Sequence, residues 1–222
     1  MKDIIVKITD IQHETHDVLN IHLEKPSDID FTPGQATEIA INKPGWKDEG
    51  RPFTFVCLPE DDYLEFMIKT YPDHDGVTNE LLNLKKGDEL ILKDVFGAIH
   101  YENEGAFIAG GAGVTPFISI LRSLKATDKI GNNKLIFANK AEKDIILREE
   151  FSEMLGANFI NILEEKTSGF ANGRITAEFL KDNNLDPDAN VYLCGPEPMM
   201  DAVKEHLLNL GVKQEKIIQE EF

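Results

Sequence analysis

The sequence predicts a protein of two parts, an antiparallel β-barrel followed by an α/β domain with a parallel sheet. Residues 1–102 hold short apolar or alternating runs separated by Pro, Gly and Asp, which is typical of β-structure. Residues 103–222 hold apolar runs of strand length that alternate with helical patterns. A glycine-rich turn at 110–113, directly after an apolar run, opens this second pattern. We therefore place the domain boundary near residue 103.

The first part is predicted to be a six-stranded antiparallel barrel, because six short strands follow one another at nearly regular spacing. The expected strands are 4–11, 18–23, 36–41, 53–58, 64–69 and 89–92. One short helix is expected at 79–84, with Thr78 as its N-cap and Gly87 beyond its end.

The second part is predicted to be a five-stranded parallel sheet covered by helices on both faces. The expected strands are 106–109, 134–138, 159–163, 191–194 and 216–219, and the expected helices are 116–126, 145–155, 176–183 and 197–210. No internal repeat or low-complexity segment interrupts this alternation.

The composition argues against several classes of partner. The formal net charge of −17 over 222 residues would repel nucleic acid and anionic membranes. No apolar run approaches the roughly 18 residues that a membrane helix needs, and no signal-peptide pattern is present. Two cysteines, Cys57 and Cys194, are too few for an iron–sulfur cluster. We expect a monomeric cytoplasmic protein without a metal site.

The glycine-rich turn is a candidate phosphate site. The apolar run at 106–109 predicts a strand, and Gly110–Gly113 removes nearly all side chains from the turn after it. Thr115 is predicted to be the N-cap and Pro116 the first residue of the next helix. Bare backbone at a helix N-terminus favours an anion. The alternative is a tight connection that binds nothing.

Two further segments carry candidate binding chemistry. Arg51-Pro52-Phe53-Thr54 offers a guanidinium fork suited to a pyrophosphate and a ring two residues on, on the same face of the strand. The alternative is that Arg51 only makes a surface ion pair and that Phe53 lies in the core. Cys194-Gly195-Pro196 follows a strand at the edge where α/β sheets bind ligands. The alternative there is a buried structural cysteine, and no nearby histidine supports a nucleophilic thiolate.

These segments occur in a characteristic order, and together they resemble the ferredoxin–NADP reductase superfamily over essentially the whole chain. The motifs are Arg-x-Phe-Thr, Gly-Gly-x-Gly-Val-Thr-Pro and Cys-Gly-Pro-x-x-Met, with Thr32-Pro33-Gly34-Gln35 and Gly173-Arg174-Ile175-Thr176 as further similar segments. The resemblance implies an FAD-binding barrel and an NAD(P)H-binding domain. It implies hydride transfer from NAD(P)H to the flavin, and then electron transfer to a separate flavodoxin, ferredoxin or haem protein.

The resemblance also implies roles for individual residues. Arg51 would bind the flavin pyrophosphate, Phe53 would cover one face of the isoalloxazine, and Thr54 would hydrogen-bond near its N5. The other implied flavin contacts are Pro52, Ile68, Lys69, Thr70, Val77 and Thr78. Asp75 stands where the family usually has glycine, which leaves FMN as an alternative to FAD.

The implied coenzyme site lies in the second domain. Its residues would be Gly111, Gly113, Thr115, Pro116, Asn139, Lys140, Cys194, Gly195, Pro196 and Met199. Cys194 would lie beside the nicotinamide carbon that gives up hydride. The terminal Phe222 looks like an aromatic residue that stacks on the free flavin face and must leave before hydride transfer.

Several alternatives stay open at this stage. Glu142 and Asp144 beside Lys140 and Lys143 favour NADH over NADPH only weakly. The chain could instead be a flavin-binding regulatory subunit of an oxygenase or dehydrogenase complex, or a dinucleotide-binding module without flavin. A net charge of −17 would repel an acidic acceptor unless basic residues cluster near the flavin.

Overall fold

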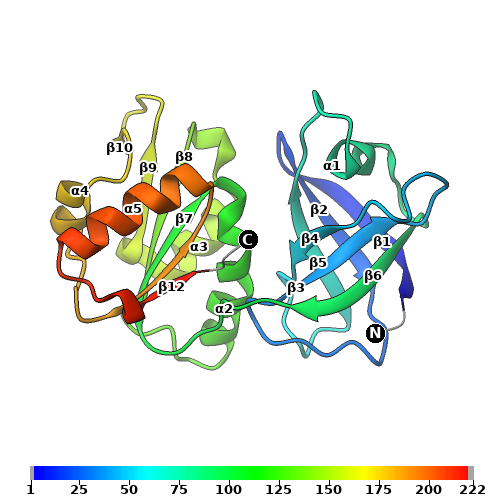
Figure 1. Cartoon of the computed structure of the whole chain (residues 1–222), viewed down its shortest axis with the longest axis horizontal. Helices are drawn as coiled ribbons and strands as arrows, with labels where there is room; N and C mark the ends of the chain where they lie inside the picture. The colour runs from blue at the N-terminus through cyan, green and yellow to red at the C-terminus, as the bar shows by residue number, and fades with distance from the viewer. Residues whose placement is uncertain (1–2, 220–222) are drawn as a thin grey trace. The chain divides into compact units, whose positions relative to one another are not determined.

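The computed structural model describes residues 3–219, and these form two compact units. The first contains the residues up to His100 together with Thr115–Ser123, and the second contains Tyr101–Val114 together with the residues from Leu124 on (Figure 1). The domain limits at residues 102 and 103 stay a prediction. Among the described residues, no helix has the length and apolar character needed to cross a membrane.

The first unit contains a six-stranded antiparallel sheet, as the sequence predicts. Its strand order is β4-β3-β6-β1-β2-β5. The strands are β1 (Ile4–Thr15), β2 (Val18–Glu24), β3 (Ala36–Ile41), β4 (Arg51–Thr54), β5 (Tyr63–Lys69) and β6 (Glu89–Phe96). Every pair within this order is antiparallel.

The fourth strand is shifted from its predicted position at 53–58, because the residues after Thr54 leave the β3 ladder. The Phe55 amide donates to the Gln35 carbonyl at 3.0 Å, and the Val56 amide donates to the Glu65 carbonyl at 3.0 Å. The second bond joins the segment that follows β4 to β5, the other end strand of the order, and so draws the two ends of the sheet together. The apolar interior contains Ile8, Ile21, Leu23, Ile39, Ile41, Phe55, Phe66 and Leu90 among others.

The short helix differs from its prediction. It runs over α1 (Val77–Glu80) and continues as a 3₁₀ turn over Leu81–Asn83, and its N-cap is Gly76 rather than Thr78. The Gly76 carbonyl accepts the amides of Asn79 and Glu80. Val77 is buried, so the apolar anchor of the helix lies before the predicted cap.

The second unit contains a parallel sheet of six strands rather than the predicted five. Its order is β10-β9-β8-β7-β11-β12. The strands are β7 (Gly105–Gly110), β8 (Lys134–Asn139), β9 (Phe159–Leu163), β10 (Ala171–Asn172), β11 (Asn190–Cys194) and β12 (Ile217–Gln219). The additional strand β10 has two residues, too few for a periodic sequence signal, and it is held to Leu163 by the Asn172 side chain at 3.0 Å.

Helices cover both faces of this sheet. They are α3 (Arg148–Leu155), α4 (Ala177–Asp182) and α5 (Glu197–Asn209), whereas most of α2 (Thr115–Ala126) belongs to the first unit. On one face of the sheet, where Figure 1 shows α4 and α5, Leu180 and Val203 belong to the same buried cluster as Ile136. On the opposite face, Phe151 of α3 contacts Phe159, because successive side chains along a strand point to opposite faces. The α3 helix begins three residues after its predicted start, because Leu147 has a positive φ of 50°.

An aromatic stack joins the start of β7 to β11 in the second unit. Tyr192 is fully buried, and its ring centroid lies 4.4 Å from that of Phe107 and 6.0 Å from that of Tyr101. Its hydroxyl accepts the amides of Glu102 and Asn103 at 2.9 and 3.0 Å and donates to the Asn103 carbonyl at 2.7 Å. One buried hydroxyl therefore satisfies three backbone groups.

We expect Tyr192→Phe to lower the free energy of unfolding by about 1–3 kcal/mol, because it removes the acceptor of the part-buried Glu102 and Asn103 amides. Urea titration followed by circular dichroism measures the change. The matched control is Tyr101→Phe, which removes only an acceptor for the Asn133 amide at 3.3 Å and should cost less than about 1 kcal/mol. Equal losses in the two variants would contradict this assignment.

Candidate flavin and coenzyme site

The predicted pyrophosphate arginine lies at the start of β4 with its guanidinium at the surface. Its Nη1 donates to the Gly50 carbonyl at 2.7 Å, and its Nη2 lies 3.6 Å from a Glu49 carboxylate oxygen. The Arg51 side chain is 51% exposed, so a bound anion can reach its remaining donors. The weak pairing with Glu49 is easily displaced, since exposed ion pairs contribute little.

The next residues of β4 alternate between the two faces of the sheet. Phe53 pairs with Thr37 of β3, and its half-buried ring packs against the barrel core. The alternative interpretation of Phe53 is therefore partly right, although part of the ring stays accessible. Thr54 is also half-buried and points to the opposite face, whereas Pro52 is exposed.

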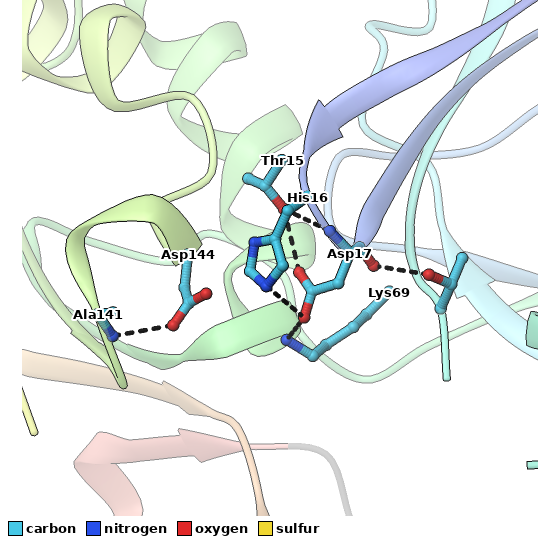
Figure 2. Close-up of polar contacts among 7 residues, drawn as sticks. Thr15, His16, Asp17, Lys69, Ala141 and Asp144 are labelled. Atoms are coloured by element: carbon cyan, nitrogen blue, oxygen red, sulfur yellow. Dashed lines mark hydrogen bonds and ion pairs between the residues drawn. The ribbon is translucent and has the colours of Figure 1, made fainter. Parts of the chain in front are cut away.

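The predicted flavin contacts on β5 are fixed by the turn between β1 and β2. Figure 2 shows the Asp17 side chain between Thr15 and Lys69, whose ammonium lies 2.5 Å from Asp17 Oδ2. Thr70 is buried and donates its hydroxyl and its amide to the Asp17 carbonyl at 3.0 and 2.8 Å. Burial acts to raise the pKa of Asp17, but the hydrogen bond and charge of Lys69 hold that pKa below its usual value.

The facing edges of β4 and β5 leave backbone groups for a ligand. In the strand order of residues 3–219, each of these strands has only one neighbour. The segment just after β4 is joined to β5 by the bond from the Val56 amide to the Glu65 carbonyl. We call this open stretch, residues 51–54 and 67–70, the barrel seam. Its backbone donors and acceptors beside the Arg51 fork suit a flavin with its pyrophosphate.

The remaining predicted flavin contacts lie at α1. The Val77 side chain is buried in the barrel core, and Thr78 is half-buried at the surface. Only their backbone amides and the Thr78 hydroxyl are thus available to a ligand.

In the second unit, two segments that are far apart in the sequence meet with almost no side chain between them. A Cβ on Gly113 would lie 2.4 Å from the Cys194 carbonyl oxygen, and a Cβ on Gly110 would lie 2.5 Å from Met199 Sδ. A Cβ on Gly195 would lie 2.7 Å from Met199 Cε. Gly113 meets backbone and therefore requires glycine, whereas a side chain at Gly110 or Gly195 would require the Met199 side chain to shift. We call Gly110–Gly113 with Cys194–Gly195 the glycine surface.

The outer side of the glycine surface is open. Gly111 has a φ of +52°, and a Cβ there would meet nothing within 4 Å. Cys194 is 7% exposed at the end of β11, where its strand pairs with β7 at Ala109. The carboxyl edge of a parallel sheet is the usual place for a dinucleotide, and bare backbone lets the pyrophosphate approach closely.

Two predictions about the glycine turn require correction or qualification. Thr115 is the first residue of α2 rather than its N-cap, because a 3₁₀ turn over Gly111–Val114 precedes the helix. Thr115 and the buried Pro116 belong to the first unit, whereas Gly111, Gly113 and Cys194 belong to the second. Pro196 is the N-cap of α5.

Phe222 lies outside the described residues 3–219, and its stacking role stays a prediction.

The end of β8 carries the predicted residues Asn139 and Lys140. Asn139 is 7% exposed, and neither polar atom of its side-chain amide has a hydrogen-bond partner among the described residues, whereas Lys140 is exposed. A buried amide without a partner is costly, and a coenzyme hydroxyl or an ordered water would satisfy it.

The run Lys143–Arg148, which resembles NADH-using members of the family, ends in an arginine for which the sequence alone indicates no individual role. Arg148 donates to the Glu142 carboxylate, and its guanidinium lies 5.1 Å from the centroid of the Phe170 ring. Asp144 accepts the Ala141 amide at 2.8 Å (Figure 2). The nearby acidic residues were visible in the sequence, but no spacing signal connects Arg148 with Phe170.

Comparison with known proteins assigns both halves of the chain. A family model described as an FAD-binding domain matches residues 4–104, and one described as an oxidoreductase NAD-binding domain matches residues 107–205. NADH-cytochrome b5 reductase 1 of Aspergillus terreus is 32% identical over 224 residues, which cover 91% of this chain and 75% of that protein. The reductase component of propane 2-monooxygenase from Mycolicibacterium smegmatis is 28% identical over 242 residues, which cover 100% and 68%.

The fold has a counterpart among solved structures. A ferredoxin NADP⁺ reductase from Neisseria gonorrhoeae, with bound FAD and NADP, superposes with a TM-score of 0.85 at 20% identity, covering 99% of this chain and 98% of that one. The barrel seam fits FAD, and the glycine surface fits a dinucleotide. This chain is an NAD(P)H-dependent flavin-containing reductase and belongs to the ferredoxin–NADP reductase superfamily.

Proposed function

We propose that the chain is an NADH-preferring reductase that takes hydride onto bound FAD and passes electrons singly to a separate protein. The glycine surface carries this proposal, because it offers bare backbone where a dinucleotide pyrophosphate must approach. Bound FAD supplies the hydride acceptor and the change from two-electron to one-electron transfer. The chain binds and orients both cofactors, with Cys194 beside the nicotinamide and the Thr54 hydroxyl near flavin N5.

The preference for NADH rests on the residues after β8, where the adenosine ribose of a dinucleotide is expected. A 2′-phosphate would meet the carboxylates of Glu142 and Asp144 there, and Arg148 is already engaged by Glu142. Lys140 and Lys143 lie beside them and offset part of the repulsion. The NADPH phosphate would therefore find no unopposed cation among these residues.

We expect steady-state kcat/KM to be about tenfold higher for NADH than for NADPH. Glu142→Gln should free Arg148 and raise kcat/KM for NADPH about three- to tenfold while changing that for NADH less than about twofold. The matched control is Glu153→Gln, which removes the same charge from an exposed position on α3. An equal rise for both coenzymes, or no rise for NADPH, would contradict the specificity role of Glu142.

The flavin is proposed to lie at the barrel seam with its pyrophosphate at Arg51. The supporting observations are the exposed guanidinium and the unpaired backbone edges of β4 and β5. The Phe53 ring offers an apolar surface two residues along the same face. Backbone groups of Ile68, Lys69 and Thr70 would contact the flavin from the opposite edge of the seam.

We expect Arg51→Ala to weaken FAD binding roughly 10- to 150-fold, since charge-assisted hydrogen bonds of this kind contribute about 1.5–3 kcal/mol. Fluorescence titration of the apoprotein with FAD measures the affinity. The companion variant Glu49→Gln removes the surface partner of Arg51 and should tighten FAD binding by up to about threefold. Retention of a full flavin complement by Arg51→Ala after extensive dialysis would reject this assignment.

The electron acceptor is proposed to be a separate protein, such as a flavodoxin, a ferredoxin or a haem protein. The relatives that support an external acceptor carry cytochrome b5 or a monooxygenase in their names. The net charge of −17 favours an acceptor with a basic docking face. The predicted cytoplasmic location and monomeric state remain predictions.

The charge argument has a direct kinetic test. The second-order rate of electron transfer to a basic haem protein should fall as the salt concentration rises, whereas the rate to an acidic ferredoxin or flavodoxin should rise. Stopped-flow mixing of the reduced enzyme with each acceptor measures both rates. A rate to an acidic acceptor that falls with salt would show a local basic docking patch and overturn the preference for a basic partner. Absence of any flavin reduction by NADH or NADPH would instead favour a regulatory subunit.

A further inference from the structure

A carboxylate buried inside the first unit is held by polar partners from two other elements, β2 and α2. The Glu65 side chain on β5 is 5% exposed. It accepts the Asn20 amide of β2 at 2.9 Å and the Arg122 guanidinium of α2 at 2.6 Å. A buried charge is costly unless such partners surround it.

Arg122 connects this carboxylate to the point where the barrel closes. Its Nη1 also donates to the Val56 carbonyl at 2.8 Å, and the Val56 amide donates to the Glu65 carbonyl. The guanidinium therefore binds both sides of the junction between β5 and the segment that follows β4. The open stretch of the barrel seam continues from this junction along β4 and β5.

A second buried contact fixes the same face of α2. The Ser119 hydroxyl accepts the Gly34 amide at 3.0 Å, and Ser119 is fully buried. Gly34 has a φ of +100°, and a Cβ there would lie 2.4 Å from the Ile99 carbonyl oxygen. Residues three apart lie on one face of a helix. Two contacts on that face fix both the rotation and the sliding of α2 on the barrel.

The helix that is held in this way begins where the glycine turn ends. The chain passes from the second unit into the first at Val114 and Thr115, directly after the 3₁₀ turn over Gly111–Val114. Arg122 lies about two helical turns beyond Thr115. A shift of the helix on the barrel is therefore transmitted to one end of the glycine turn.

We propose that Arg122 and Glu65 are positioning residues for hydride transfer: they fix α2 on the barrel, and α2 is continuous in the chain with the coenzyme-binding glycine turn. A buried ion pair adds little net stability compared with apolar packing, but only a narrow range of geometries satisfies it. Hydride transfer needs the reacting atoms about 3–3.5 Å apart, and small misplacements are costly. The inference rests on the proposed place of the flavin at the seam.

The test uses flavin-loaded Glu65→Gln, Arg122→Lys and Ser119→Ala. Anaerobic stopped-flow reduction over a range of NADH concentrations gives the limiting rate and the NADH dissociation constant separately. We expect the limiting rate to fall about tenfold or more in the first two variants and about threefold in Ser119→Ala. The dissociation constant should stay within about twofold, and reduction by dithionite, which needs no bound coenzyme, should be unchanged.

The matched control is Lys43→Gln, which removes a surface ion pair with Asp88 at 3.5 Å in the same unit and should leave the limiting rate unchanged. A limiting rate within about twofold of wild type in all three variants, even with lowered thermal stability, would overturn the proposal. If Glu65→Gln does not fold, Arg122→Lys and Ser119→Ala decide the question. If the wild-type enzyme is reduced by NADPH and not NADH, only the coenzyme preference fails, and the variants are compared with NADPH.

Discussion

The bond from the Val56 amide to the Glu65 carbonyl determines where the barrel of the first unit closes, and the proposed flavin site depends on where that closure stops. Beyond the junction, β4 and β5 keep unpaired edges in the described strand order, beside the exposed fork of Arg51. An edge of this kind is a liability in a sheet unless something covers it. A planar ligand with hydrogen-bonding groups along its rim satisfies the same backbone groups.

The proposed coenzyme site in the second unit depends on a different constraint, which is the near absence of side chains from the glycine surface. Gly113 lies against the Cys194 carbonyl at a distance that no Cβ permits, and Gly110 lies against the Met199 side chain. The turn after β7 and the turn after β11 can therefore form one surface at the carboxyl edge of the sheet. The exposed backbone suits a pyrophosphate, which a layer of side chains would hold away.

Electrostatic interactions act over three ranges of distance in this protein. The buried Glu65 is paired because an isolated charge would be too costly, whereas the Glu49–Arg51 contact is exposed and weak. The acidic turn after β8 bears on the choice between two coenzymes that differ by one phosphate. The net charge of −17 bears on the approach of a protein partner, over distances that salt screens.

The sequence by itself determined the fold class and most of the strands, because alternating and apolar runs report burial directly, as at 36–41 and 159–163. It also singled out Arg51, the glycine turn and Cys194, whose residue types are informative without neighbours. Only the tertiary structure decided the two-residue strand β10, the Gly76 cap of α1, and the pairing of Arg122 with Glu65. Those features join residues through space, and a periodic pattern along one chain carries no information about which distant residues meet.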